Sequence, residues 1–88
     1  MIVQDFIPYV PPRDTIETAY AALSAVQHAH PGVQVAAIAV LFKEMAETAG
    51  CDIPTLLNQA GRIVNDDDVA FRASIKALRE YVKQEIVK

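Results

Sequence analysis

The stretch VQVAAIAVLFKEMAETAG, residues 33 to 50, is the most apolar part of this 88-residue chain. Residues 35 to 42 are apolar without a break, which fits either a buried strand or a buried helix. The alanines favour a helix, because alanine is a strong helix former and a poor strand residue. Gly50 supplies a stop, since glycine readily adopts the left-handed conformation that ends many helices. We therefore predict a helix over residues 33–49.

The polar residues of this stretch indicate its environment. Lys43, Glu44 and Glu47 form one stripe in the last two turns, whereas the first turns are apolar on every side. A helix that is apolar all round is buried or lies at an interface. We predict that it is the central core helix, with a partner-facing position as the alternative. Lys43 also ends the apolar run far short of the roughly 20 residues that a membrane span needs.

Length and composition limit the class of protein. Eighty-eight residues allow one domain, and 52% of them are hydrophobic, which is high for a small monomer. We therefore predict a homo-oligomer, most simply a homodimer. The single cysteine, Cys51, excludes an intramolecular disulfide. The first basic residue is Arg13, so the N-terminus lacks the charged region of a signal peptide, and we expect a cytoplasmic protein.

The first twelve residues, MIVQDFIPYVPP, precede a single helical domain of residues 13–88. This segment contains six large apolar residues, but Pro8, Pro11 and Pro12 disfavour both a helix and a central strand. We predict an extended apolar arm over residues 1–12 that lies across its own helices, because such residues are rarely left in water. Exchange between subunits, or docking on another protein, is the alternative.

Three further helices are predicted from apolar residues at spacings of three and four, near 14–30, 53–64 and 67–87. The fold class is therefore all-α, a small bundle of about four helices. The expected N-caps are Asp14 or Thr15 for the first of these helices, Asp52 for the second and the segment 65–68 for the third. The residues of the last helix expected to pack inward are Phe71, Ile75, Leu78, Val82 and Ile86.

The histidines, the cysteine and the aspartate cluster of this sequence, which are residue types that often catalyse reactions or bind metals, are each better explained by a structural role. His28 and His30 do not share a helix face, so we expect them near a helix C-terminus rather than on a metal. Cys51 has no activating base nearby, which indicates a buried or boundary thiol. Residues 66–68 are aspartates but lack the other ligands of a calcium loop. We predict no catalytic, cofactor or metal site, no small-molecule substrate and no enzyme activity.

Charge is unevenly distributed along this acidic chain, whose net charge is −3. Residues 1–68 carry three basic and nine acidic side chains, whereas residues 69–88 carry five basic and two acidic ones. Four cations in the last helix recur at spacings of four, three and four, so they form one stripe: Arg72, Lys76, Arg79 and Lys83. This stripe is either a solvated face or a contact surface for phosphate, an anionic membrane or an acidic protein.

The segment FKEMAETAGCDIPTLLNQAGRIV, residues 42–64, resembles a helix-turn-helix, the DNA-reading unit of many bacterial regulators. The residues that carry the resemblance are the small Ala46, Gly50 at the turn, and Met45, Ala49 and Leu56 at apolar positions. The resemblance implies that helix 53–64 is a recognition helix. Its side chains able to bond base edges would be Thr55, Asn58, Gln59 and Arg62.

These observations support two functional hypotheses. The first is a small non-enzymatic, self-associating helical protein that binds another macromolecule as an interaction, adaptor or regulatory module. Its partner is expected to be another protein, with nucleic acid as the second choice. The alternative is a dimeric helix-turn-helix-like transcriptional regulator that binds DNA, which requires Asn58, Gln59 and Arg62 to be exposed on helix 53–64.

Overall fold

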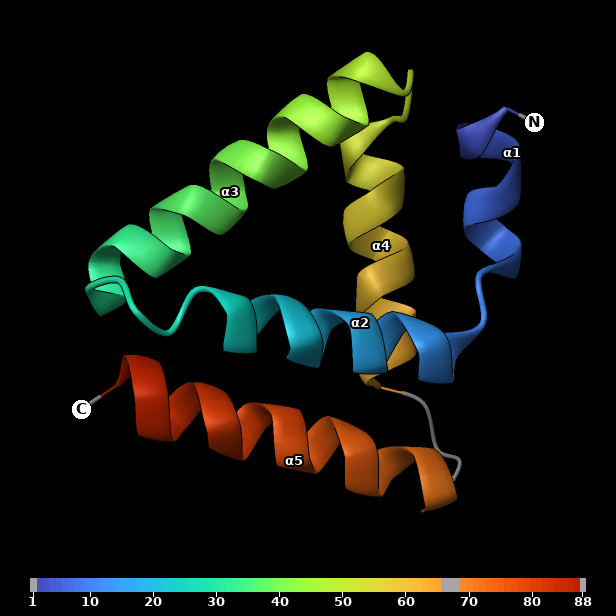
Figure 1. The fold of residues 1–88 in the computed structure, drawn as a ribbon. Helices are drawn as coiled ribbons and strands as arrows, with labels where there is room; N and C mark the ends of the chain where they lie inside the picture. Colours follow the sequence, from blue (N-terminus) through green and yellow to red (C-terminus); the bar gives the residue numbers. More distant parts are fainter. Residues whose placement is uncertain (1, 66–68, 88) are drawn as a thin grey trace.

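Helices account for nearly all of the chain in the computed structural model, which describes residues 2–65 and 69–87 (Figure 1). The elements in chain order are α1 (Val3–Phe6), the short 3₁₀ helix η1 (Ile7–Tyr9), α2 (Pro12–Ala25), α3 (Pro31–Thr48), α4 (Ile53–Val64) and α5 (Val69–Ile86). The described ranges contain no strand, so the predicted all-α class is confirmed. The helices α2 to α5 correspond to the four predicted helices, and α1 is an addition.

The N-terminal arm differs in conformation from the extended segment predicted for residues 1–12. It is helical because its prolines stand at the starts of helices, with Pro8 in the first turn of η1 and Pro12 at the first position of α2. The N–H that proline lacks would have no partner in a first turn, so proline is tolerated there. The arm contacts its own chain, since Gln4 Oε1 accepts a hydrogen bond from the Asp52 N–H at 3.0 Å.

The turn between α2 and α3 also differs from the prediction. α2 ends at Ala25 rather than near residue 30, and α3 begins at Pro31. His30 is the N-cap of α3, where its Nδ1 accepts a hydrogen bond from the Gly32 N–H at 3.0 Å. The expected position of His30 at a helix C-terminus is therefore wrong. An imidazole acceptor satisfies one of the N–H groups that the start of a helix leaves without a partner.

The predicted N-caps of α2 and α4 have different outcomes. α2 begins two residues before Asp14, and Thr15 Oγ1 donates to the Pro11 carbonyl at 2.9 Å, so neither predicted residue caps this helix. Asp52 does cap α4, as predicted, because its Oδ2 accepts from the Thr55 hydroxyl at 2.6 Å and from the Thr55 N–H at 3.1 Å. The cap predicted for the last helix involves residues 66–68, which lie outside the described residues.

Gly50 ends α3 in the way the sequence predicts. Its φ of 71° is left-handed, a conformation that costs glycine little because it has no Cβ. The Gly50 N–H donates to the Glu47 carbonyl at 3.2 Å, and the Cys51 N–H donates to the Ala46 carbonyl at 2.8 Å. These bonds turn the chain back at once, so that α4 starts beside the end of α3.

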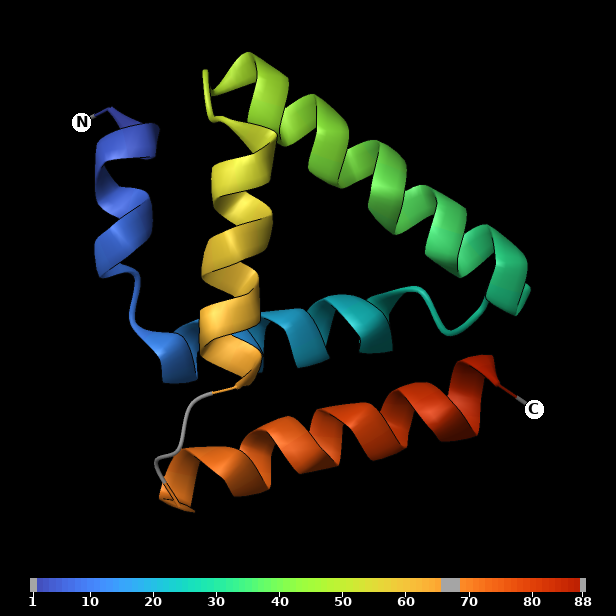
Figure 2. The ribbon, with the colours of Figure 1, turned by 180° about the vertical axis from the view of Figure 1, so that it is seen from behind.

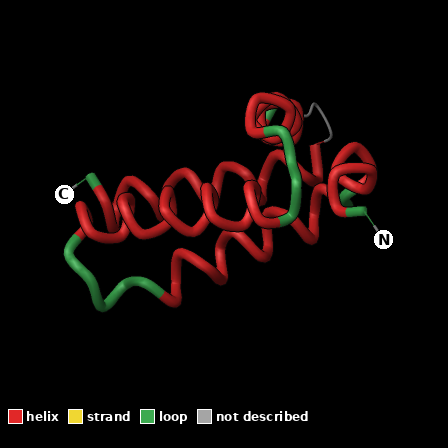
Figure 3. The backbone as a smooth tube through the Cα atoms, turned by 90° about the horizontal axis from the view of Figure 1, so that it is seen from above, coloured by secondary structure: helices red, strands yellow, loops and turns green. Residues whose placement is uncertain are grey.

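The helices form a flat assembly with extents of 38 × 32 × 18 Å. α1 and α4 run side by side, and the view from above shows both nearly end-on (Figures 1, 2 and 3). α2 and α5 also lie side by side, where the Tyr20 and Tyr81 rings meet with centroids 4.6 Å apart. α3 runs from the junction with α4 to the far end of α2, as the third side of a triangle (Figure 1).

The buried core lies where α2, α4 and α5 meet. Each helix contributes one buried isoleucine to it, namely Ile16, Ile63 and Ile75, and Leu78 packs against this cluster. The inward positions predicted for Ile75 and Leu78 are therefore confirmed, and Ile86 is half-buried. The inward position predicted for Val82 is wrong, because its side chain is 37% exposed, and the Phe71 side chain lies outside the described part of α5. The three isoleucines bring together segments far apart in sequence, so the fold depends on them.

The prediction that α3 is the central core helix is wrong. Val40 and Met45 are each 62% exposed and Leu41 is 53% exposed, whereas the only buried residues of α3 are Gln34 and Ala46. α3 contacts α4, α5 and the α2–α3 turn, and most of its large apolar residues are exposed. The apolar run predicts that α3 is covered, but it does not say whether the covering residues would belong to the same chain.

Hydrogen bonds of two glutamines, Gln27 and Gln34, hold the N-terminal end of α3 against the α2–α3 turn. Gln34 is buried, donates to the Ala29 carbonyl at 2.7 Å and accepts from Gln27 Nε2 at 3.0 Å. Gln27 also donates to the Leu23 carbonyl at 3.0 Å. Polar groups removed from water need such partners, so this network fixes the direction in which α3 leaves the turn.

Our first prediction concerns the core. Ile75→Ala should lower the free energy of unfolding by about 2 to 5 kcal/mol, because it removes buried methyl groups and leaves a cavity. Leu57→Ala, at a position 59% exposed on α4, should cost about 0.5 kcal/mol or less. Urea denaturation followed by circular dichroism measures both. Equal losses in the two variants would contradict the assignment of the core to the three isoleucines.

Our second prediction concerns the α4 cap. The hydrogen bonds from the Thr55 hydroxyl and N–H hold the pKa of Asp52 below its usual value, so the cap is fully formed above about pH 3.9 and is lost as pH falls through the lower folded-state pKa. Asp52→Ala should lower the melting temperature at pH 7 by a few degrees. Asp52→Asn, which caps without titrating, should stay close to wild type at pH 7. An alanine variant as stable as the asparagine one would show that the cap contributes nothing.

Candidate functional site

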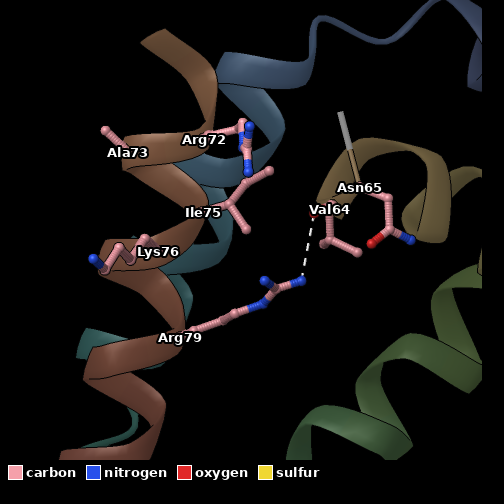
Figure 4. Close-up of a pocket in the computed structure, with 7 residues that line it drawn as sticks. All are labelled: Val64, Asn65, Arg72, Ala73, Ile75, Lys76 and Arg79. Carbon is pink, nitrogen blue, oxygen red and sulfur yellow. Dashed lines mark hydrogen bonds between the residues drawn. The ribbon is translucent and has the colours of Figure 1, made fainter. Parts of the chain in front are cut away.

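The cationic stripe of α5 borders a cleft beside the C-terminal end of α4. The cleft has a volume of about 450 Å³. Its lining residues are Val64, Asn65, Arg72, Ala73, Ile75, Lys76 and Arg79 (Figure 4). Three of the four cations predicted as a contact surface therefore surround one hollow. We call this hollow the cationic cleft.

The two arginines of the cationic cleft differ from its lysine in direction. Arg72 and Arg79 extend from α5 on the side of Val64 and Asn65, whereas the Lys76 ammonium points away (Figure 4). Arg79 Nη2 donates to the Val64 carbonyl at 3.4 Å, at the negative end of the α4 dipole. A guanidinium has five N–H donors, so Arg79 keeps others for a ligand.

Lys83 continues the stripe one turn beyond the cationic cleft. Its Nζ lies 3.6 Å from Glu80 Oε1, in an exposed ion pair that contributes little to stability. Arg72 and Lys76 have no ion pair within the described ranges of the chain.

This arrangement suits a carboxylate that arrives with an apolar neighbour. Arg72 and Arg79 both line the cationic cleft, and a guanidinium group binds a carboxylate in a forked geometry that the two groups share. Val64 is half-buried and Ile75 is buried at the floor, so the cationic cleft also has an apolar side. Sequence reasoning missed Val64 and Asn65, which become neighbours of the cations only because α4 ends beside α5.

The residues of the recognition-helix alternative are not all equivalent in the structure. Thr55, Asn58 and Arg62 share one exposed side of α4, whereas Gln59 is half-buried. The Thr55 hydroxyl already donates to Asp52. α4 also has α1 on one side and α3 on the other (Figures 1 and 2). These neighbours leave one free side of α4 for contact with another molecule.

A second hollow, apolar and about 310 Å³ in volume, lies between the N-terminal arm and the junction of α3 with α4. Its lining residues include Val3, Ile7, Phe42 and Leu56. Cys51, which is half-buried, lies on the same wall, so the boundary position predicted for this thiol is confirmed. The hollow places the apolar side chains of the arm opposite those of α3.

The other candidate residues do not converge. His30 is used as a cap and His28 is exposed in the turn after α2. Within residues 2–65 and 69–87, no three side chains of the metal-binding types come together. No helix in these ranges has both the length and the hydrophobicity to cross a bilayer.

Comparison with known proteins adds no relative to these observations. The chain matches no family model, no curated protein and no solved structure.

Proposed function

We propose that this protein is a non-enzymatic, self-associating helical module that binds an acidic segment of another protein in the cationic cleft. The observation that carries this proposal is that Arg72 and Arg79 line one cleft together with Val64 and Asn65 at the end of α4. One carboxylate would bind the two guanidinium groups, and an adjacent apolar side chain of the partner would contact Val64. Lys76 and Lys83 would extend the attraction along α5.

The charge of the chain favours an acidic protein segment over nucleic acid. Duplex DNA carries one negative charge per roughly 1.7 Å, so a long stretch of phosphates would face the protein. Nine acidic side chains in residues 1–68 would repel such a polyanion, and three of them, at 66–68, directly follow Asn65 in the sequence. A short peptide with one or two carboxylates can use the two arginines while meeting less of this repulsion.

The self-association in this proposal is supported by the exposed apolar surface. Large apolar residues are exposed along α3, and others are exposed on the arm, including Ile2 and Tyr9. Large apolar patches on soluble proteins commonly mark interaction sites. Association would therefore cover surface that one copy of this small fold leaves in water.

Our third prediction tests the cationic cleft with a fluorescein-labelled peptide of alternating Glu and Leu, read by fluorescence anisotropy. Arg72→Gln combined with Arg79→Gln should weaken binding roughly tenfold or more, because two charged hydrogen-bond donors are lost. Wild-type binding should weaken steeply as salt rises, because surface charges become screened. The fourfold variant, with Lys76→Gln and Lys83→Gln added, should abolish measurable binding.

The matched control removes the same number of arginines elsewhere, with Arg13→Gln and Arg62→Gln in one chain. It should bind the peptide as wild type does. A peptide of alternating Gln and Leu should not bind. If the control variant loses affinity for a 20-base-pair DNA duplex while the Arg72/Arg79 variant keeps it, the recognition-helix alternative replaces this proposal. Peptide binding that is unaffected in the Arg72/Arg79 variant would overturn the cleft assignment.

A further inference from the structure

One side of α3 is largely apolar and open to solvent over about three turns. It consists of Val33, Ala37, Val40, Leu41 and Met45, all exposed, and we call it the α3 face. α3 contains no charged residue before Lys43. The α3 face therefore offers a largely apolar surface over residues 33–45, with Glu44 as its one charged residue.

The area that this fold leaves exposed is large for its size. The chain has 6336 Å² of accessible surface, whereas a compact monomer of 9.6 kDa exposes about 5,100 Å². Its radius of gyration, 13.6 Å, also exceeds the roughly 12 Å expected for a compact domain of this length. The excess surface is comparable to or larger than the roughly 800 Å² that each partner buries in a standard interface.

We propose that α3 of a second copy covers the α3 face, with the two helices antiparallel. The two-fold axis passes through the α3 face at the level of residue 39 along the helix, although the Ala39 side chain itself lies on the opposite side. This inference rests on the self-association in the proposed function and names its surface. In this register Val33 lies opposite Met45 of the partner subunit. Ala37 lies opposite Leu41 of the partner subunit, so a small side chain meets a large one on each side of the axis. Such alternation lets two helices interdigitate, and the contact is the same from both copies.

The charges on α3 favour the antiparallel direction. Glu44 lies toward the C-terminal end of the α3 face and is exposed. In a parallel pair Glu44 would face Glu44 of the partner subunit, and the two carboxylates would repel each other. In the antiparallel pair Glu44 lies beside the first turn of the partner's helix, where the helix dipole is positive. Lys43 and Glu47 lie outside the face and pair with each other at 2.8 Å.

The test compares two alanines on different sides of α3 by sedimentation equilibrium of the full chain. Ala37→Glu places a carboxylate in the middle of the α3 face in both copies, and we expect it to raise the dimer dissociation constant roughly a hundredfold. Ala39→Glu makes the same change on the opposite side of the helix, where Ala39 is also exposed, and should leave the constant unchanged. Circular dichroism should show the same helix content in both variants.

A crosslinking experiment tests the register. In a Cys51→Ala background, chains carrying Ala37→Cys are mixed with chains carrying Leu41→Cys and oxidised. The mixed disulfide should form in excess of its statistical share, because these positions face each other across the axis. A statistical mixture would overturn the register.

The outcomes separate this inference from the function on which it rests. A wild-type monomer at all concentrations would overturn both the α3 pairing and the proposed self-association. A wild-type dimer that Ala37→Glu leaves intact would overturn the α3 pairing alone. The peptide-binding assay of the cationic cleft is independent of both, since the α3 face does not include the cleft residues.

Discussion

The contact among Ile16, Ile63 and Ile75 is the constraint on which the rest of this structure depends. These residues join α2, α4 and α5, which are the only helices that bury an apolar cluster together within the described ranges. Burial of each isoleucine contributes a few kcal/mol at most, and a small domain has little stability beyond that. The cluster fixes the position of α4 against α2 and α5. α4 in turn forms one wall of the cationic cleft and contacts α3, so the positions of the cleft and of α3 depend on the cluster.

The two surfaces with proposed roles differ in how the fold supports them. The cationic cleft lies directly beside the isoleucine cluster, since Ile75 belongs to both. Its arginines therefore extend from a well-anchored segment of α5. α3 is anchored instead by the turn at Gly50, by the buried Gln34 and by contacts with α4 and α5, while Val40 and Leu41 in its middle are exposed. A second copy would supply the packing that the middle of α3 lacks.

Local features of the fold could be predicted from sequence because they depend on single residues. The cap at Asp52, the stop at Gly50 and the helical register of α4 and α5 each follow from neighbouring side chains. The burial of α3 could not be predicted in this way, since periodicity is a local property and burial depends on which helices fold back onto it. The cleft shows the same limit: the spacing of Arg72 and Arg79 predicts one stripe, but the nearness of Val64 depends on how α4 and α5 meet. The role of His30 was missed because the prediction placed Pro31 after a helix, whereas it begins one.

A thickness of 18 Å has a consequence for how this sequence can change. Two helices of about 10 Å diameter fill that depth, so almost every position has one side near water. Very few positions are then restricted in size and polarity by their surroundings, and many others are free to accept new side chains. Such a scaffold can acquire or lose a binding specificity through surface substitutions while keeping the few contacts that fold it.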